Sequence, residues 1–153
     1  MMILGVVHLK SLPGSSSNKL NLDEITELAQ SDIDNLTKAG VSGIIIENFG
    51  DVPFVKNDVS KRTVASFTSV IQNLNIDSKL KIGINVLRND GIAALSIAEA
   101  TNADFVRINV LNNVMMFTDQ GIIEGEANQI AEFNQSLNTV SYTHLTLPTI
   151  LLV

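Results

Sequence analysis

The chain has 153 residues, of which 45% are hydrophobic and 17% are charged, with a formal net charge of −6 and no cysteine. This composition is typical of one globular domain, and without cysteine the chain forms no disulfide and no thiolate metal site. Apolar runs are far shorter than the roughly twenty residues that cross a bilayer, and Lys and Arg are not clustered. We therefore expect a cytoplasmic protein with no integral membrane segment and no nucleic-acid partner.

Apolar runs of strand length alternate with segments of helical periodicity along the first 137 residues. The expected strands are 3–7, 44–47, 80–86 and 105–110, and the expected helices are 22–39, a second one from Ser60, 91–100 and 125–137. Asn21 and Glu24 form a capping-box pattern before the first helix, and Gly40 follows its end. This alternation is typical of βα units that build a parallel sheet.

Four βα units make up half of a (β/α)8 barrel, which normally needs about 200 to 250 residues. We predict an α/β fold that corresponds to the N-terminal half of a TIM-type barrel. The alternative is an open, doubly wound parallel sheet. Long loops after the first, second and fourth strands favour the barrel, as does the lack of a Gly-rich phosphate fingerprint after the first strand.

The last residues, 138–153, do not continue this pattern. They contain no Asp, Glu, Lys or Arg, and Pro148 would interrupt a central strand. We therefore divide the chain into a partial barrel at 1–137 and a tail at 138–153, which we interpret as translated adapter sequence or an assembly artefact. The alternative is a genuine fifth strand. On the first interpretation, the intact gene continues past Leu137 for about a hundred residues to complete the barrel.

Polar residues stand at the carboxyl ends of the expected strands, where parallel barrels bind their ligands. Side-chain alternation puts His8, Glu47, Asn85 and either Arg107 or Asn109 on one face of the sheet. A histidine and carboxylates suit general acid–base chemistry, whereas amides and guanidinium groups suit a small polar or anionic ligand. We predict that the catalytic residues are His8, Glu47 and Asp119, and that the ligand-binding residues are Asn48, Asn85, Arg88, Arg107 and Asn109.

Each candidate also has a structural interpretation. Glu47 and Arg107 are equally compatible with a buried ion pair inside the barrel, and Asp119 with an ordinary turn residue. Arg88 lies beside a helix that Asp90 can cap, so it is either a rim residue or an anion contact. Gly83 lies beneath Asn85, and we expect the space that it leaves to favour a ligand. No pattern indicates a metal site or identifies a cofactor.

Five blocks of sequence occur in a specific order. They are GVVHL at 5–9 with LPGS at 12–15, GIIIENFGDVPF at 43–54, GINVLRND at 83–90, ADFVRIN at 103–109 and TDQGIIEG at 118–125. Their order and spacing resemble the BtpA/SgcQ family of barrel proteins across residues 3–137. Residues 111–117 depart from the family's small-residue pattern, so the loop after the fourth strand is expected to differ.

The resemblance implies a TIM-type barrel and the family label of photosystem I biogenesis, but no settled reaction. We expect a small polar or phosphorylated metabolite to bind at the barrel mouth, with a homo-oligomer as a further partner state. One alternative is an enzyme of sugar or nucleoside metabolism that is unrelated to photosystem assembly. Another is a truncated product without function.

Overall fold

The computed structural model describes residues 2–56, 58–112, 115–118, 121–137 and 142–144. The strands are β1 (Leu4–His8), β2 (Gly43–Glu47), β3 (Lys81–Asn85), β4 (Phe105–Arg107), β5 (Met115–Thr118), β6 (Gly121–Glu124) and β7 (Tyr142–His144). The helices are α1 (Leu22–Lys38), α2 (Lys61–Gln72), α3 (Gly91–Thr101) and α4 (Ala127–Ser136). No helix within the described ranges has the length and apolar character needed to cross a membrane.

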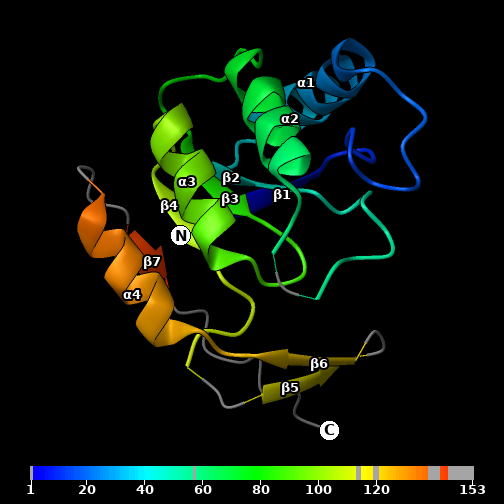
Figure 1. Ribbon diagram of the computed structural model, residues 1–153. Coiled ribbons are helices and arrows are strands. Elements are labelled where there is room, and N and C mark those ends of the chain that lie inside the picture. Colours follow the sequence, from blue (N-terminus) through cyan, green and yellow to red (C-terminus); the bar gives the residue numbers. More distant parts are fainter. Residues whose placement is uncertain (1, 57, 113–114, 119–120, 138–141, 145–153) are drawn as a thin grey trace, which may run out of the picture.

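The main sheet is parallel and has the order β1-β2-β3-β4-β7 (Figure 1). Strands β1 to β4 lie side by side in the order in which they occur in the chain, each followed in sequence by a helix or a longer connection. A doubly wound sheet instead reverses its strand order at a switch point. The sequential order is that of consecutive units of a barrel, as predicted for the first half of a TIM-type fold.

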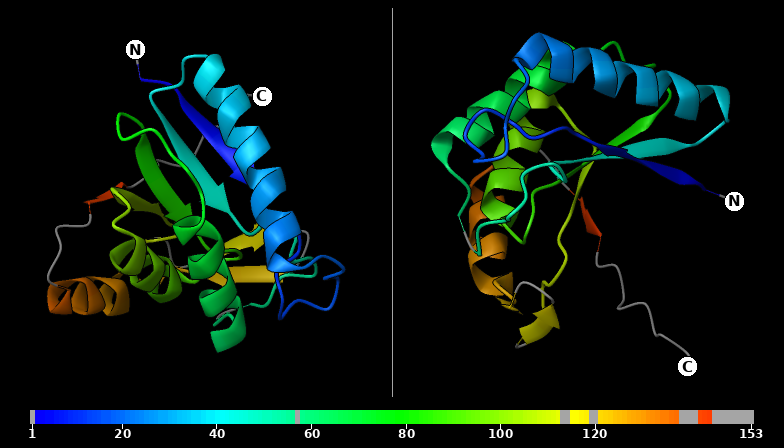
Figure 2. Two further views of the ribbon diagram at one scale, coloured as in Figure 1. Left: turned by 90° about the horizontal axis from the view of Figure 1, so that it is seen from above. Right: turned by 90° about the vertical axis from the view of Figure 1, so that its right-hand side faces the viewer.

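One face of the sheet packs against helices α1, α2 and α3, which lie on the same side of the strands (Figure 2). The helix-facing side chains that are completely buried are Val7, Ile44, Ile46, Ile84 and Val106. Burial of each such side chain contributes roughly 1.5–3 kcal/mol. On the opposite face of β1, Leu4 and Val6 keep 38% and 43% of their surface exposed. In a closed (β/α)8 barrel, the sheet face opposite the helices is the interior.

Local hydrogen bonds define the helix starts. The capping box predicted for α1 is present: the Glu24 amide donates to Asn21 Oδ1 at 2.9 Å, and the Asn21 amide donates to Glu24 Oε2 at 2.8 Å. Gly40 follows the end of α1 with a φ of +79°, a conformation that glycine adopts without strain. Asp90 caps α3 by accepting from the Ala93 amide at 2.8 Å. These caps satisfy backbone amides in the first turns of α1 and α3.

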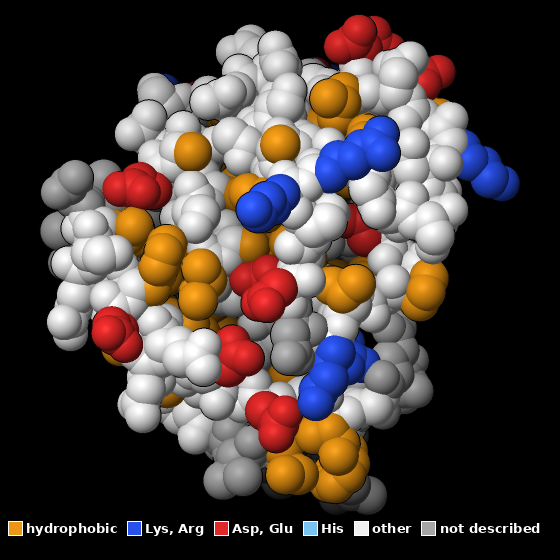
Figure 3. All heavy atoms as spheres, in the orientation of Figure 1, with side chains coloured by type: hydrophobic (Ala, Val, Ile, Leu, Met, Phe, Trp, Pro, Cys, Tyr) orange, Lys and Arg blue, Asp and Glu red, His pale blue; other side chains and the backbone are white. Residues whose placement is uncertain are grey.

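The segment expected to be a long loop after the fourth strand contains an antiparallel hairpin, β5–β6. Residues 119–120, between the two strands in the sequence, lie outside the described residues. Met115, Phe117 and Ile122 keep 43%, 77% and 37% of their surface exposed. Figure 3 shows hydrophobic side chains gathered at the lower end of the molecule, where Figure 1 places the hairpin. Strand β4 also ends earlier than expected, at Arg107.

A short strand from the tail extends the sheet. Tyr142–His144 forms β7, which pairs in parallel with β4 so that Arg107 is opposite His144. A fifth strand is what the alternative interpretation of the tail expected. The rest of the segment, residues 138–141 and 145–153, lies outside the described residues. The boundary at 137 and the artefact origin of the tail stay predictions.

Candidate functional site

The strand register aligns four polar residues along the carboxyl edge of the sheet. His8 is level with Glu47, and Glu47 is level with Asn85. Ile84 pairs with Val106, which brings Arg107 level with Asn85 on the next strand. The same alternation that buries Val7, Ile46, Ile84 and Val106 against the helices turns the members of this polar row to the opposite face.

Glu47 is the centre of the polar row. Its Oε2 accepts a hydrogen bond from Arg107 Nη1 at 3.2 Å, and its Oε1 lies 3.9 Å from His8 Nε2. Only 7% of the Glu47 side chain is exposed, compared with 38% for Arg107 and 52% for His8. The carboxylate therefore lies below two cationic or ionisable groups that reach solvent.

Burial sets the protonation behaviour of Glu47. Burial raises the pKa of this carboxyl above its usual range, and the nearby Arg107 and His8 lower it only in part. A carboxyl that binds a proton more readily than an exposed glutamate is a candidate for general acid–base work. Perturbed groups of this kind occur in active sites, and also in structural ion-pair networks.

Asn85 is almost fully buried beside Arg107. Its Nδ2 donates to the Arg107 carbonyl at 2.8 Å and lies 3.5 Å from Asn109 Oδ1. Its Oδ1 has no hydrogen-bond partner within the described part of the chain. Asn109 in turn donates to the Arg88 carbonyl at 2.9 Å. Asn109 therefore belongs to the neighbouring network rather than replacing Arg107 in the polar row.

The expectation that Gly83 leaves space beneath Asn85 is wrong. A Cβ on Gly83 would clash with the ring of Phe105, which lies across it from the next strand. The glycine therefore makes room for an aromatic ring of the same sheet face, not for a ligand.

An aromatic pair that strand alternation does not indicate extends the site beyond the strands. The Phe49 ring stacks on His8 with a centroid distance of 4.3 Å and an interplanar angle of 16°. Phe54 meets the edge of Phe49 at 6.2 Å. Both aromatic residues lie in the ENFGDVPF block, so this motif is the sequence feature that could have indicated their role in the site. Stacking orients the imidazole toward Glu47.

Asn48 lies on the other side of β2 from Glu47 and holds loops together. Its Oδ1 accepts from the Leu87 amide at 2.7 Å, and its Nδ2 donates to Asp51 Oδ2 at 3.0 Å. Asp51 Oδ1 accepts from the Leu12 amide at 2.7 Å. Burial raises the pKa of Asp51, while the hydrogen bonds from Leu12 and Asn48 oppose that increase. This buried chain connects the segments that follow β1, β2 and β3.

The remaining candidates lie apart from the polar row. Arg88 is buried, with Nη2 lying 3.5 Å from the Ile122 carbonyl of β6. Asp119 lies outside the described residues. Among the described residues, no three His, Asp or Glu side chains are grouped as metal ligands. The residues that the structure brings together are thus His8, Glu47, Asn85 and Arg107.

The fold and this row define a parallel α/β protein of half-barrel arrangement with a polar edge at the carboxyl ends of its strands. The family model for the BtpA family matches residues 1–146, and the chain belongs to that family.

Three relatives show how widely this sequence is shared. An uncharacterised protein of Pyrococcus horikoshii is 50% identical over 135 residues, which cover 88% of this chain and 51% of the relative. The photosystem I biogenesis protein BtpA of Synechocystis is 42% identical over 137 residues, covering 90% and 47%. An uncharacterised mitochondrial protein of Caenorhabditis elegans is 32% identical over 144 residues, covering 89% and 50%. The chain spans about half the length of the curated relatives that it matches.

Proposed function

We propose that the polar row of His8, Glu47, Asn85 and Arg107 binds a small polar, anionic molecule at the carboxyl edge of the sheet. The observation that carries the proposal is the convergence of four such groups from four consecutive strands. Arg107 keeps 38% of its side chain exposed while it contacts a buried carboxylate. A guanidinium in that position can still bind a carboxylate or phosphate from solvent.

The polar row also contains the parts of an acid–base pair. Glu47 has a raised pKa because of its burial, and His8 lies 3.9 Å away on the solvent side. We infer that these two groups exchange a proton with the bound molecule while Arg107 holds its negative charge. The unpartnered Asn85 Oδ1 supplies an acceptor within the same row. We also propose Asp119, which lies outside the described residues, as a third catalytic residue.

Isothermal titration calorimetry of the full chain with inorganic phosphate and with pyruvate tests the binding proposal. We expect saturable binding that Arg107→Gln weakens at least tenfold. Lys81→Gln is the matched control, because Lys81 shares the sheet face, forms an ion pair with Asp104 and lies at the opposite end of β3. Equal losses in the two variants, or no saturation by either anion, would overturn the proposal.

Assembly of photosystem I is the second candidate, and it is supported by the name of the Synechocystis relative. The 32% identity to an animal protein weighs against it as the shared role of the family, because animals have no photosystems. Small-molecule binding requires no photosynthetic host. Deleting the gene in its host distinguishes the two candidates: a defect confined to photosystem I content would favour assembly.

A further inference from the structure

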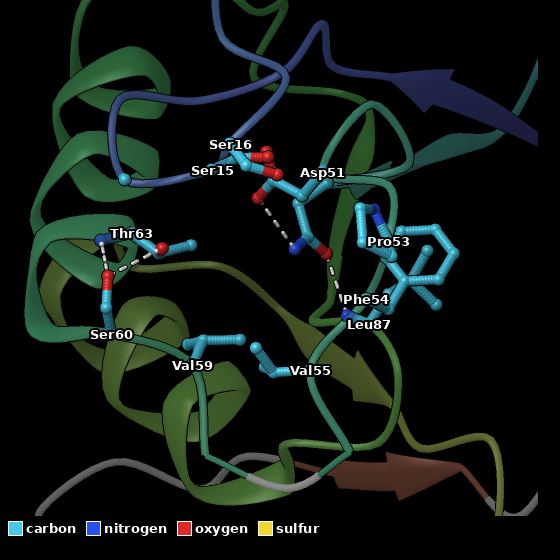
Figure 4. A pocket seen from close by; sticks show the side chains of 12 residues that line it. Ser15, Ser16, Asp51, Pro53, Phe54, Val55, Val59, Ser60, Thr63 and Leu87 are labelled. Atoms are coloured by element: carbon cyan, nitrogen blue, oxygen red, sulfur yellow. Dashed lines mark hydrogen bonds between the residues drawn. The ribbon is translucent and has the colours of Figure 1, made fainter. Parts of the chain in front are cut away.

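A pocket separate from the polar row lies on the helix side of the sheet. It has a volume of about 250 Å³, is partly open to solvent and is bordered by the loop after β1, the loop after β2 and the first turn of α2 (Figure 4). Glu47 and Asn48 are consecutive in the chain and point to opposite sides, so the polar row and this pocket lie on different sides of the end of β2.

Two pairs of polar side chains line the pocket. Asn48 donates one amide hydrogen to Asp51 Oδ2 at 3.0 Å, which leaves a second amide hydrogen and further carboxylate lone pairs. Opposite them, the hydroxyl groups of Ser60 and Thr63 lie 2.9 Å apart at the start of α2 (Figure 4). Each hydroxyl can both donate and accept. The two pairs together provide donors and acceptors on both sides of the cavity.

Ser15 and Ser16 also line the pocket, and most of the remaining wall is apolar. Pro53, Phe54 and Val55 contribute from the loop after β2, and Val59 contributes from the residue before the α2 cap. Carbon–hydrogen faces of a ligand can pack there while its polar groups meet the two hydrogen-bonding pairs. Pockets for drug-sized ligands measure about 300–1,000 Å³, so this smaller one suits a molecule of about three to six carbon atoms.

The charge of the wall selects against an anion. The Asp51 carboxylate is buried at the pocket, and within the described part of the chain it accepts hydrogen bonds from two neutral donors, the Leu12 amide and the Asn48 side chain. An anionic ligand would approach this carboxylate in a region of low dielectric, where like charges repel strongly. A hydroxyl group can instead donate to Asp51 and accept from Asn48 at the same time.

From this geometry we infer a second binding site, in which Asn48, Asp51, Ser60 and Thr63 bind a small neutral polyol. One hydroxyl group of the ligand bridges Asn48 and Asp51, and another contacts the Ser60–Thr63 pair. The site does not depend on the polar row, because none of His8, Glu47, Asn85 and Arg107 lines the pocket.

Saturation-transfer NMR of the full chain with glycerol, erythritol and ribitol tests this inference. We expect saturable binding of at least one probe, weakened at least threefold by Thr63→Val, which removes one hydroxyl and keeps the shape. Thr68→Val is the matched control on α2, since Thr68 bonds to the Val64 carbonyl and lines no part of the pocket; it should bind as the wild type does. Equal weakening in both variants would overturn the inference.

A second pair of variants tests the site with substitutions that lie outside helix α2. Val55 is 49% exposed and lines the pocket, so Val55→Trp should fill the cavity and abolish polyol binding with the fold intact. Val52→Trp is the control on the same loop, at a residue that is 45% exposed and does not line the pocket. Unchanged binding in Val55→Trp, or no saturation by any polyol in the wild type, would refute the site.

Two cross-checks separate this site from the polar row. Arg107→Gln should leave polyol binding unchanged, and Val55→Trp should leave anion binding unchanged. If inorganic phosphate binds and Val55→Trp abolishes that binding while no polyol binds, the pocket is an anion site and the polyol assignment is wrong.

Discussion

Replacing Glu47 with glutamine tests whether the Glu47–Arg107 pair holds the sheet together. Removing one partner of a fully buried ion pair costs about 3–5 kcal/mol, because the other charge stays buried without compensation. Here the Arg107 side chain is 38% exposed, so water can solvate its guanidinium after the substitution. The glutamine amide oxygen can also accept from Arg107 Nη1 in place of the carboxylate.

Two opposing contributions determine the magnitude. Loss of an ion pair with a partly exposed partner costs about 0–1 kcal/mol. Burial raises the pKa of Glu47 despite Arg107 and His8, so the ionised carboxylate is less favourable in the folded state than in the unfolded chain. Glutamine removes that penalty. We expect Glu47→Gln to change the free energy of unfolding by less than about 1 kcal/mol at neutral pH.

The pH dependence supplies a second measurement. Because the folded-state pKa of Glu47 is raised, its stabilising contribution is complete below the ordinary value of 4.5 and is lost as the pH rises through the raised pKa. The stability of the wild type relative to Glu47→Gln should therefore decrease over that interval. Urea denaturation, monitored by far-UV circular dichroism at one protein concentration, measures both the free energy of unfolding at neutral pH and its dependence on pH. A loss of about 3 kcal/mol or more in the variant at neutral pH would refute the reasoning.

Three further predictions concern the rest of the chain. Asn48→Ala should lower the free energy of unfolding by about 1–3 kcal/mol because it leaves the buried Leu87 amide unpaired, whereas the exposed Asn73→Ala should cost clearly less in the same denaturation assay. Burial alone would raise the pKa of Asp104, but hydrogen bonds from Lys81 and the Ile82 amide, together with the Lys81 charge, outweigh burial and lower it. The resulting stabilisation is present above the ordinary value of 3.8 and is lost as the pH falls through the lowered pKa. The melting temperatures of Asp104→Asn and the wild type should therefore converge in thermal melts at acid pH. The exposed edge of β1 with Leu4 and Val6 predicts self-association of the chain, reduced by Val6→Lys; light scattering that finds a monodisperse wild-type monomer would contradict this.

Local patterns determined the secondary structure of the chain. The helix starts depend on contacts within three residues, such as the bond from the Glu24 amide to Asn21 and from the Ala93 amide to Asp90, so the sequence contains both partners. Strand alternation likewise predicted which side chains share a face. The placement of Glu47, Asn85 and Arg107 on one face follows from that rule, together with a register that aligns the strand ends.

The segment after β4 shows a limit of local sequence patterns, because a loop was predicted where the structure has a hairpin. The runs 115–118 and 121–124 are separated by two residues, a spacing typical of a hairpin, but no turn dipeptide such as Asn-Gly lies between them, and the sequence predicted a long loop at this place. The glycine at position 121 is the sequence feature that could have indicated the hairpin, and it adopts a φ of +105° in the structure. The hairpin then contacts Arg88, for which the sequence predicted either a place at the rim or an anion contact.

Contacts between distant segments decided the chemistry of individual side chains. Asn48 accepts a hydrogen bond from the Leu87 amide and Asp51 accepts one from the Leu12 amide. Each pair is 39 residues apart in the sequence, so local spacing indicates neither partner. The ring of Phe105 fills the space over Gly83 only because β3 and β4 adopt one particular register. Sequence periodicity reports the direction of a side chain relative to its own strand. Which atoms it meets depends on how the strands and loops pack, and only the tertiary structure determines that.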